Sequence, residues 1–285
     1  KMNAAMDRLV AGRGGAGLSS AELIIEAVAE RLDIKQAVFS AAEKQAKREA
    51  VLATNTSSIP LEEIAGALKD PSRLIGLHFY NPVPVLPLVE VIASRHSDDV
   101  AMAKGMSFAG QLKKMPIQCK SSPGFVVNRA LLPYINAGVA DMLAGGNPDE
   151  IDQAMVNYGM PMGPIELADQ IGIDVMFDAS TPLGMPDDVA QTYQNMIEDG
   201  TIGRKSGQGF YEWDDKKAIR PRAVYEAKSQ AELASRLLKP MVDECQAAVD
   251  EGVVASADHA DAAMIFGVGF PGFRGGPLHY TKKIS

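Results

Sequence analysis

The stretch Leu74-Ile-Gly-Leu-His-Phe-Tyr-Asn81, which is followed by Pro82, decides the fold. Its apolar beginning predicts a buried strand. Tyr80, Asn81 and Pro82 cannot easily continue a central strand, so the strand is expected to end there. His78 therefore lies at the carboxyl end of a strand, where open α/β sheets hold their ligands.

A second apolar run, Leu86–Ile92, contains Glu90, twelve residues after His78. A carboxylate buried in a strand needs a partner, and the imidazole on the neighbouring strand is the nearest candidate. Such a pair would be a general base with an orienting carboxylate. The alternative is a structural histidine and a glutamate at a strand edge, and the two residues alone leave both interpretations open.

The segments around this stretch alternate between strands and helices. Strands are predicted over 23–28, 51–54 and 116–119, and helices over 30–47, 99–113 and the residues after Pro60. This alternation is typical of a doubly wound sheet. Ser58 is expected to cap the helix after Pro60, which leaves Ser57 as the freer hydroxyl on the same rim as His78.

The second half, from about residue 125 to 265, has an almost entirely helical pattern. Asn128 lies in its first helix, three residues after Phe125 and so near a buried face; the alternative is a polar helix residue hydrogen-bonded within the core or turned to solvent. Asp152-Gln-Ala-Met155 recurs as Asp261-Ala-Ala-Met264, and Gly159-Met-Pro161 recurs as Gly269-Phe-Pro271. These repeats predict a duplicated helical unit. Residues 213–217 are interpreted as a linker.

The predicted fold class is therefore α/β followed by all-α. Residues 1–120 form the sheet domain, 121–213 a first helical domain and 214–285 a second helical repeat. The 285 residues are 46% hydrophobic, enough for sizeable cores, and a net charge of −8 argues against a nucleic-acid-binding surface. Cys119 and Cys245 fit no metal or redox motif and suggest a reducing compartment. No apolar run reaches membrane-spanning length.

Residues Gly12–Gly17 match the pattern G-x-G-x-x-G letter for letter. The dinucleotide fingerprint must follow a strand and open a helix, so that phosphate meets the helix N-terminus. Here a short amphipathic helix over 1–11 is expected before the glycines and a strand after them. We therefore interpret this segment as a flexible loop.

Several motifs together resemble the 3-hydroxyacyl-CoA dehydrogenase family. The matching stretches are Ile24-Ile-Glu-Ala-Val28, Ala53-Thr-Asn-Thr-Ser57-Ser, Gly76-Leu-His78-Phe-Tyr-Asn81-Pro, Leu88-Val-Glu90-Val-Ile, Ser122-Pro-Gly-Phe-Val-Val-Asn128-Arg, Pro161-Met-Gly-Pro164 and Gly203-Arg-Lys-Ser-Gly-Gln-Gly-Phe-Tyr211. The second helical copy looks like the tail of the bacterial multifunctional fatty-acid oxidation subunit of the alpha type. By the same resemblance, the first half of the NAD-binding domain is expected to precede residue 1, and this chain is expected to bind NAD poorly.

The resemblance implies roles for individual residues. His78 would take the proton of the 3-hydroxyl group, Glu90 would hold its imidazole, Ser57 would bond the reacting oxygen and Asn128 would hold substrate. The implied cofactor contacts are Val28, Ala29, Glu30, Lys35, Ser57, Asn81 and Lys205, and a further implied substrate contact is Tyr280. Without the family, Glu30 and Lys35 would be interpreted as a solvated pair at a helix end.

The resemblance also implies an activity, which is NAD-dependent oxidation of (3S)-3-hydroxyacyl-CoA to 3-ketoacyl-CoA in β-oxidation. It implies an acyl-CoA substrate, no metal, a cytoplasmic location, and a homodimer or a complex with a thiolase subunit. One alternative is a catalytically silent module for dimerisation or assembly, since long helices bury apolar faces in partners. Another is a dehydrogenase of a hydroxy acid without CoA, which the set Ser57, His78, Glu90 and Asn128 disfavours.

Overall fold

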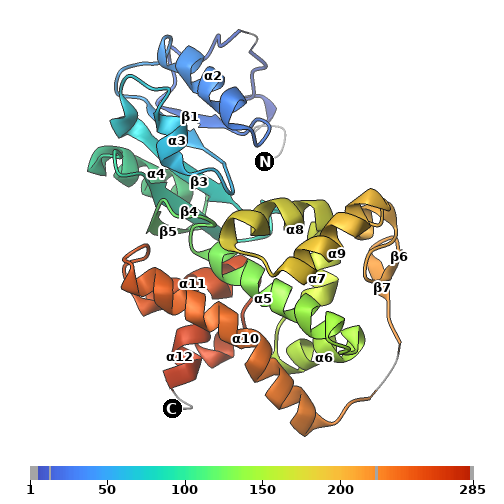
Figure 1. Cartoon of the computed structure of the whole chain (residues 1–285). Coiled ribbons are helices and arrows are strands. Elements are labelled where there is room, and N and C mark those ends of the chain that lie inside the picture. Colours follow the sequence, from blue (N-terminus) through green and yellow to red (C-terminus); the bar gives the residue numbers. More distant parts are fainter. Residues whose placement is uncertain (1–5, 13, 222–223, 283–285) are drawn as a thin grey trace.

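A computed structural model of the chain describes residues 6–12, 14–221 and 224–282. The first part is a sheet flanked by helices, and the second part is mostly helical (Figure 1). Five strands lie in sequence order across the sheet: β1 (Leu23–Glu26), β2 (Val51–Thr54), β3 (Leu74–Phe79), β4 (Leu88–Ala93) and β5 (Met115–Lys120). The helices of this part are α2 (Leu32–Glu43), α3 (Leu61–Ala65), the 3₁₀ turn η1 (Pro71–Arg73) and α4 (Asp99–Gln111).

The direction of the strands differs from a purely parallel sheet. β1, β2 and β3 are parallel to one another, but β4 pairs antiparallel with β3, and β5 is parallel to β4. Residues 80–87 join β3 to β4 without a helix, and this link is too short for the crossover that a parallel pair requires. As a result, the carboxyl end of β3 lies beside the amino end of β4.

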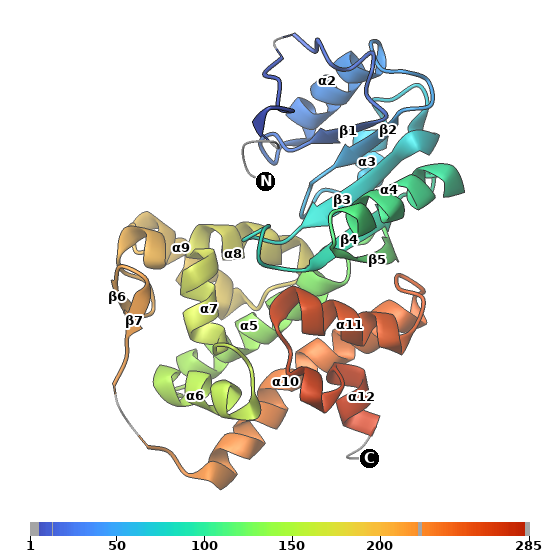
Figure 2. The ribbon, with the colours of Figure 1, turned by 180° about the vertical axis from the view of Figure 1, so that it is seen from behind.

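Helices cover both faces of the sheet (Figures 1 and 2). On one face, Met102 and Ala109 of α4 pack against Ile75, Leu77 and Val91. On the other face, α2 and α3 pack against the first strands through Phe39, Leu52, Ile64 and Leu74. Because side chains alternate along a strand, Leu88, Glu90 and Ile92 share the face opposite Val89 and Val91. Leu88 and Ile92 belong to the core of the helical part, so Glu90 points toward that part.

The helical part is built around two long helices, α5 and α10, that pack against each other. Its first elements are α5 (Val127–Leu143), α6 (Pro148–Tyr158), α7 (Pro164–Ile171), α8 (Ile173–Ser180), η2 (Thr181–Leu183), α9 (Asp187–Glu198) and η3 (Arg204–Ser206). They are followed by β6 (Glu212–Asp214), β7 (Lys217–Ile219), α10 (Ala227–Asp250), α11 (Ala257–Val268), η4 (Gly272–Arg274) and α12 (Pro277–Lys282). Within the described ranges, no helix is long and apolar enough to cross a membrane.

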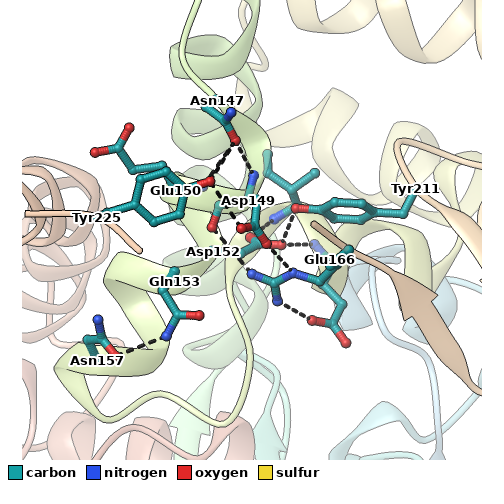
Figure 3. Close-up of polar contacts among 11 residues, drawn as sticks. Asn147, Asp149, Glu150, Asp152, Gln153, Asn157, Glu166, Tyr211 and Tyr225 are labelled. Carbon is teal, nitrogen blue, oxygen red and sulfur yellow. Dashed lines mark hydrogen bonds and ion pairs between the residues drawn. The ribbon is translucent and has the colours of Figure 1, made fainter. Parts of the chain in front are cut away.

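A network around Asp152 ties together α6, α7 and the segment after η3 (Figure 3). The buried Asp152 carboxylate accepts the backbone N–H groups of Ile165 and Glu166, the first turn of α7, and the hydroxyl of Tyr211. Arg220 pairs with Asp149 at 2.7 Å and with Glu166 at 2.9 Å. The linker interpretation of 213–217 is wrong, because β6 and β7 form an antiparallel hairpin there.

Each copy of the predicted repeat contains an aspartate that caps the helix after it. Asp261 of α11 accepts the backbone N–H groups of Leu278 and His279 in α12, as Asp152 does for α7. In both places a glycine lies directly against the aspartate. A Cβ added at Gly163 would lie 2.2 Å from the Cα of Asp152, and one at Gly276 would lie 2.3 Å from the Cβ of Asp261. Only glycine allows so close an approach.

Two local predictions need correction. Residues 1–5 of the helix expected over 1–11 lie outside the described residues and Met6 is helical, but residues 7–12 form a turn and an irregular segment, so the helix does not extend to residue 11. Ser58 does not cap a helix, because α3 begins at Leu61 after an N-cap residue, Pro60, whose side chain makes no capping bond. The Ser58 hydroxyl instead donates to Glu30 at 3.3 Å. The sequence pattern contained no information on this contact between distant segments.

Candidate active site

The predicted contact between His78 and Glu90 is confirmed. The two residues face each other across β3 and β4, and Nδ1 of His78 lies 2.8 Å from Oε2 of Glu90. Glu90 is fully buried, and His78 is only 5% exposed. The ring of Phe125 packs edge-on against the imidazole, with 5.6 Å between ring centroids.

Four donors surround the Glu90 carboxylate. Oε2 accepts from His78 and from the hydroxyl of Tyr80, and Oε1 accepts the backbone N–H groups of Val126 at 2.9 Å and Val127 at 3.1 Å. Because Val126, Val127 and Tyr80 all donate to this carboxylate, we assign to His78 the tautomer in which Nδ1 also donates to Oε2. In that tautomer Nε2 keeps its lone pair. Among the described residues, Nε2 has no hydrogen-bond partner.

The backbone before α5 makes the last two of these bonds possible. Gly124 and Phe125 both have positive φ angles, +70° and +52°, and the turn aims the N–H groups of Val126 and Val127 at Glu90. A bulky side chain in the left-handed region is a backbone outlier. Such outliers cluster at functional sites, where the surrounding structure holds them. This turn joins the sheet to the helix that carries Asn128.

Ser57 and Asn128 lie close to each other, although Ser57 follows strand β2 and Asn128 belongs to helix α5. Ser57 follows β2, and its carbonyl oxygen lies 3.5 Å from the side-chain nitrogen of Asn128. The Ser57 hydroxyl makes no hydrogen bond to another described residue. The side chain of Asn55 accepts the backbone N–H of Phe79, so the ends of β2 and β3 are held together.

Glu30 holds the loop that contains Ser57. Its Oε1 accepts from the Thr56 hydroxyl and from the backbone N–H groups of Ser57, at 2.9 Å, and Ser58, at 3.2 Å. Burial raises the pKa of Glu30, but hydrogen bonds from Thr56 and Ser57 and the charge of Lys35 outweigh it and leave this pKa below its usual value. Glu30 is thus a charged anchor for the rim.

The interpretation of Glu30 and Lys35 as a solvated pair is wrong for the lysine. Lys35 is 1% exposed, and its ammonium lies 2.9 Å from Glu26 and 3.0 Å from Glu30. Glu26, which we did not predict, also accepts from the Thr54 hydroxyl and the Val28 backbone. A buried acidic residue at the end of a strand was the available signal.

The remaining predicted residues fall into two groups. Val28, Ala29 and Asn81 are exposed at the carboxyl ends of β1 and β3, near the edge that carries Ser57. Within the described part of the chain, Lys205 and Tyr280 make no hydrogen bond, ion pair or ring contact with that edge. Lys205 pairs with Asp174, and Tyr280 packs against Tyr158 with 5.4 Å between ring centroids.

Tyr280 lines a separate cavity of about 480 Å³ between helices α6, α10 and α12. Arg274 lies over the Tyr158 ring in the same place, 3.9 Å from its centroid. The structure therefore does not bring Tyr280 to His78. Among the described residues, no cluster of His, Cys, Asp and Glu is arranged to hold a metal ion.

Comparison with known proteins agrees with this geometry. Residues 1–122 match the model of the 3-hydroxyacyl-CoA dehydrogenase NAD binding domain, and residues 124–213 match the model of the C-terminal domain. An (S)-3-hydroxybutyryl-CoA dehydrogenase from Ralstonia eutropha is 34% identical, with a TM-score of 0.70, and the match covers 74% of this chain and 77% of that one. This chain belongs to the 3-hydroxyacyl-CoA dehydrogenase family.

Further relatives agree with this membership. The 3-hydroxybutyryl-CoA dehydrogenase of Escherichia coli K12 is 26% identical with a TM-score of 0.83, and the match covers 94% of this chain and 76% of that one. The fatty acid oxidation complex subunit alpha of Vibrio cholerae is 37% identical over all of this chain. This chain spans 42% of the length of that subunit.

The NAD binding domain identifies NAD as the cofactor of this family member. The rim formed by the ends of β1, β2 and β3 fits a nicotinamide, because it offers polar groups: the exposed Asn81 amide and a Ser57 hydroxyl that makes no hydrogen bond to another described residue. Gly12 lies in an irregular segment and residues 14–17 lie in turns before β1, and none of them opens a helix. That segment is therefore not the phosphate-binding turn of a dinucleotide site.

Proposed function

We propose that this protein oxidises (3S)-3-hydroxyacyl-CoA to 3-ketoacyl-CoA with NAD, as the dehydrogenase region of a multifunctional fatty-acid oxidation subunit. The observation that carries the proposal is the buried pair of His78 and Glu90 on adjacent strands, together with a Ser57 hydroxyl that makes no hydrogen bond to another described residue and follows the end of β2. A base oriented by a carboxylate and a donor for the reacting oxygen are the groups that oxidation of a secondary alcohol needs.

His78 acts as the general base in this proposal. Its Nε2 takes the proton of the substrate 3-hydroxyl, and the imidazolium that forms is stabilised by Glu90 at 2.8 Å. The backbone N–H groups of Val126 and Val127 hold the Glu90 carboxylate in place for this role. NAD, when bound, supplies the acceptor for the hydride that leaves C3.

Ser57 and Asn128 position the substrate. The Ser57 hydroxyl donates to the reacting oxygen. Asn128, at the start of α5, holds the substrate, and the carbonyl group of the substrate is one group that its amide can bond. Val28, Ala29, Glu30, Lys35, Asn81 and Lys205 are the proposed cofactor contacts, with Lys35 acting from a buried position through Glu30. Tyr280 remains a proposed substrate contact, in its separate cavity.

The proposed domain boundaries, partners and location follow the resemblance to the alpha subunits. We place the sheet domain at 1–120 and the two helical units at 121–213 and 214–285, and the matching caps formed by Asp152 and Asp261 support the duplication. The name of the relatives, a complex subunit, supports assembly with a partner such as a thiolase subunit or a second copy. A cytoplasmic location belongs to the same proposal.

Steady-state kinetics test the proposal, with NAD reduction measured in the presence of a (3S)-3-hydroxyacyl-CoA. His78→Gln should lower turnover by about 100- to 10,000-fold with a smaller effect on substrate binding. His96→Gln is the matched control, because His96 is exposed and its ring contacts Arg95. Near wild-type turnover in His78→Gln would remove this histidine from the mechanism.

A further inference from the structure

The hydroxyl of Tyr80 has a partner that the reaction described above does not explain. It donates to Oε2 of Glu90, the same oxygen that holds Nδ1 of His78. Tyr80 follows His78 by two positions, so the two side chains lie on the same face of the chain. Their ring centroids are 4.5 Å apart.

The direction of this hydrogen bond is fixed by the two protonation states. Burial and the neighbouring Glu90 carboxylate raise the pKa of Tyr80 well above its ordinary value, so the phenol keeps its proton and donates. Two donors therefore share one oxygen of Glu90. Each hydrogen bond that stabilises this carboxylate lowers the negative charge that is available to the imidazolium of His78.

We propose that Tyr80 is a positioning residue that acts through Glu90 and sets the pH range in which His78 works as a base. The inference rests on the proposed function, since it concerns the same base. It adds a residue whose hydroxyl bonds to Glu90 and, among the described residues, to neither Nε2 of His78 nor Ser57. The phenol fixes the carboxylate against rotation and moderates its attraction for the protonated ring.

The surroundings of Glu90 leave few other groups that could have this effect. β5 contributes Cys119, whose pKa is raised well above its ordinary value by burial and by Glu90, so the thiol stays neutral. The start of α5 contributes the N–H groups of Val126 and Val127. α11 approaches β4 at Gly267, next to Leu88, without a charged group at that contact. Tyr80 is thus the side chain beside His78 through which the carboxylate is tuned.

The expected effect of Tyr80→Phe has a definite sign. Without the phenol, Oε2 of Glu90 serves His78 alone, and the protonated ring becomes more stable. The acid limb of the pH–rate profile should therefore move to higher pH by about 0.5 to 1 unit. Turnover on the alkaline plateau should stay within about threefold of the wild type, because the base and its carboxylate remain.

The matched control is Tyr134→Phe. Tyr134 is also a buried tyrosine inside α5, but its hydroxyl has no hydrogen-bond partner among the described residues. This variant removes the same atom without touching Glu90. Both variants should be measured for the pH–rate profile and by ¹⁵N NMR titration of the His78 ring, with the resonance assigned by its loss in His78→Gln.

The two measurements separate the inference from the proposed function. An upward shift of the His78 titration in Tyr80→Phe, and none in Tyr134→Phe, supports the inference even if the wild type does not oxidise a 3-hydroxyacyl-CoA. Absence of that oxidation contradicts the proposed function alone. If Tyr80→Phe lowers the melting temperature but leaves the His78 titration in place, Tyr80 is only structural and the inference is wrong.

Discussion

Glu90 at the sheet–helix junction and Asp152 in the helical core hold their helices in the same way. Each is a buried carboxylate that accepts two successive backbone N–H groups at the start of a helix, α5 for Glu90 and α7 for Asp152. They differ in their remaining partners. Glu90 holds His78, which has a free ring nitrogen, whereas Asp152 holds the Tyr211 hydroxyl.

The difference teaches that burial and hydrogen bonding alone do not identify a reactive carboxylate. Burial raises the pKa of Asp152 to about 7, although it belongs to no proposed reaction. What distinguishes Glu90 is a titratable partner that lies beside the rim formed by the ends of β2 and β3. The raised pKa of Asp152 follows from its burial, and the carboxylate is present in the helical core because it caps α7.

The largest expected effect concerns a third buried carboxylate, Glu26, whose partner is a cation. Lys35→Met would leave Glu26 buried without its ion pair, and the free energy of unfolding should fall by about 3–5 kcal/mol. Chemical denaturation measures this change. The double variant Glu26→Gln and Lys35→Met should recover part of the loss, because the buried carboxylate is then removed as well and only the part-exposed Glu30 lacks its cation.

This prediction extends the comparison to Glu26, a carboxylate that has both an ion pair with a lysine and hydrogen bonds from a hydroxyl and a backbone N–H. If Lys35→Met costs less than about 1 kcal/mol, the ion pair contributes little and Lys35 is available to a ligand. A loss of stability without recovery in the double variant would mean that packing of the lysine stem, rather than its charge, stabilises this region.

The next effect tests the structural side of the comparison. Asp152→Asn replaces one acceptor oxygen by a donor that faces a backbone N–H, so the free energy of unfolding should fall by about 1.5–3 kcal/mol. Asp261→Asn should cause a similar loss if the two helical units are equivalent. Asp243→Asn, at an exposed pair with Lys239, is the control and should cost at most about 0.5 kcal/mol.

The smallest effect is a pH dependence at Glu30. Its pKa is lower in the folded chain than the ordinary value of 4.5, because the hydrogen bonds from Thr56 and Ser57 and the charge of Lys35 outweigh burial. Its contribution to stability is therefore complete above pH 4.5 and is lost as the pH falls through the lowered value. The melting temperature of the wild type should fall more steeply between pH 5 and pH 3 than that of Glu30→Gln. Equal slopes would show that Glu30 does not anchor the Ser57 loop.

The pairing of His78 with Glu90 was predictable from sequence because it depends on local rules. A short link between two apolar runs makes an antiparallel neighbour, and a buried carboxylate in the second run needs a partner from the first. The helical second part was equally visible in its periodicity, and the repeated Asp-x-Ala-Met motif marked two positions that cap the following helix.

The contacts missed from sequence join segments far apart in the chain. Glu26 meets Lys35 and Thr54, and the Ser58 hydroxyl is bonded to Glu30, 28 positions earlier, instead of capping a helix. Backbone N–H groups as partners of Glu90 have no side-chain signature, because their direction depends on the φ angle of Phe125. The contact of Tyr80 was not predicted: strand alternation puts Tyr80 on the same side as His78, but only the folded structure shows that its hydroxyl reaches Glu90.

The most direct test compares Glu90→Gln with Asp152→Asn, with turnover and the free energy of unfolding measured on the same preparations. We predict that Glu90→Gln lowers turnover strongly, though less than His78→Gln does, because the base is still present but no longer held by a charge. Asp152→Asn should lower stability and leave the turnover of the folded protein unchanged. Wild-type turnover in Glu90→Gln, with only a loss of stability like that of Asp152→Asn, would contradict the account.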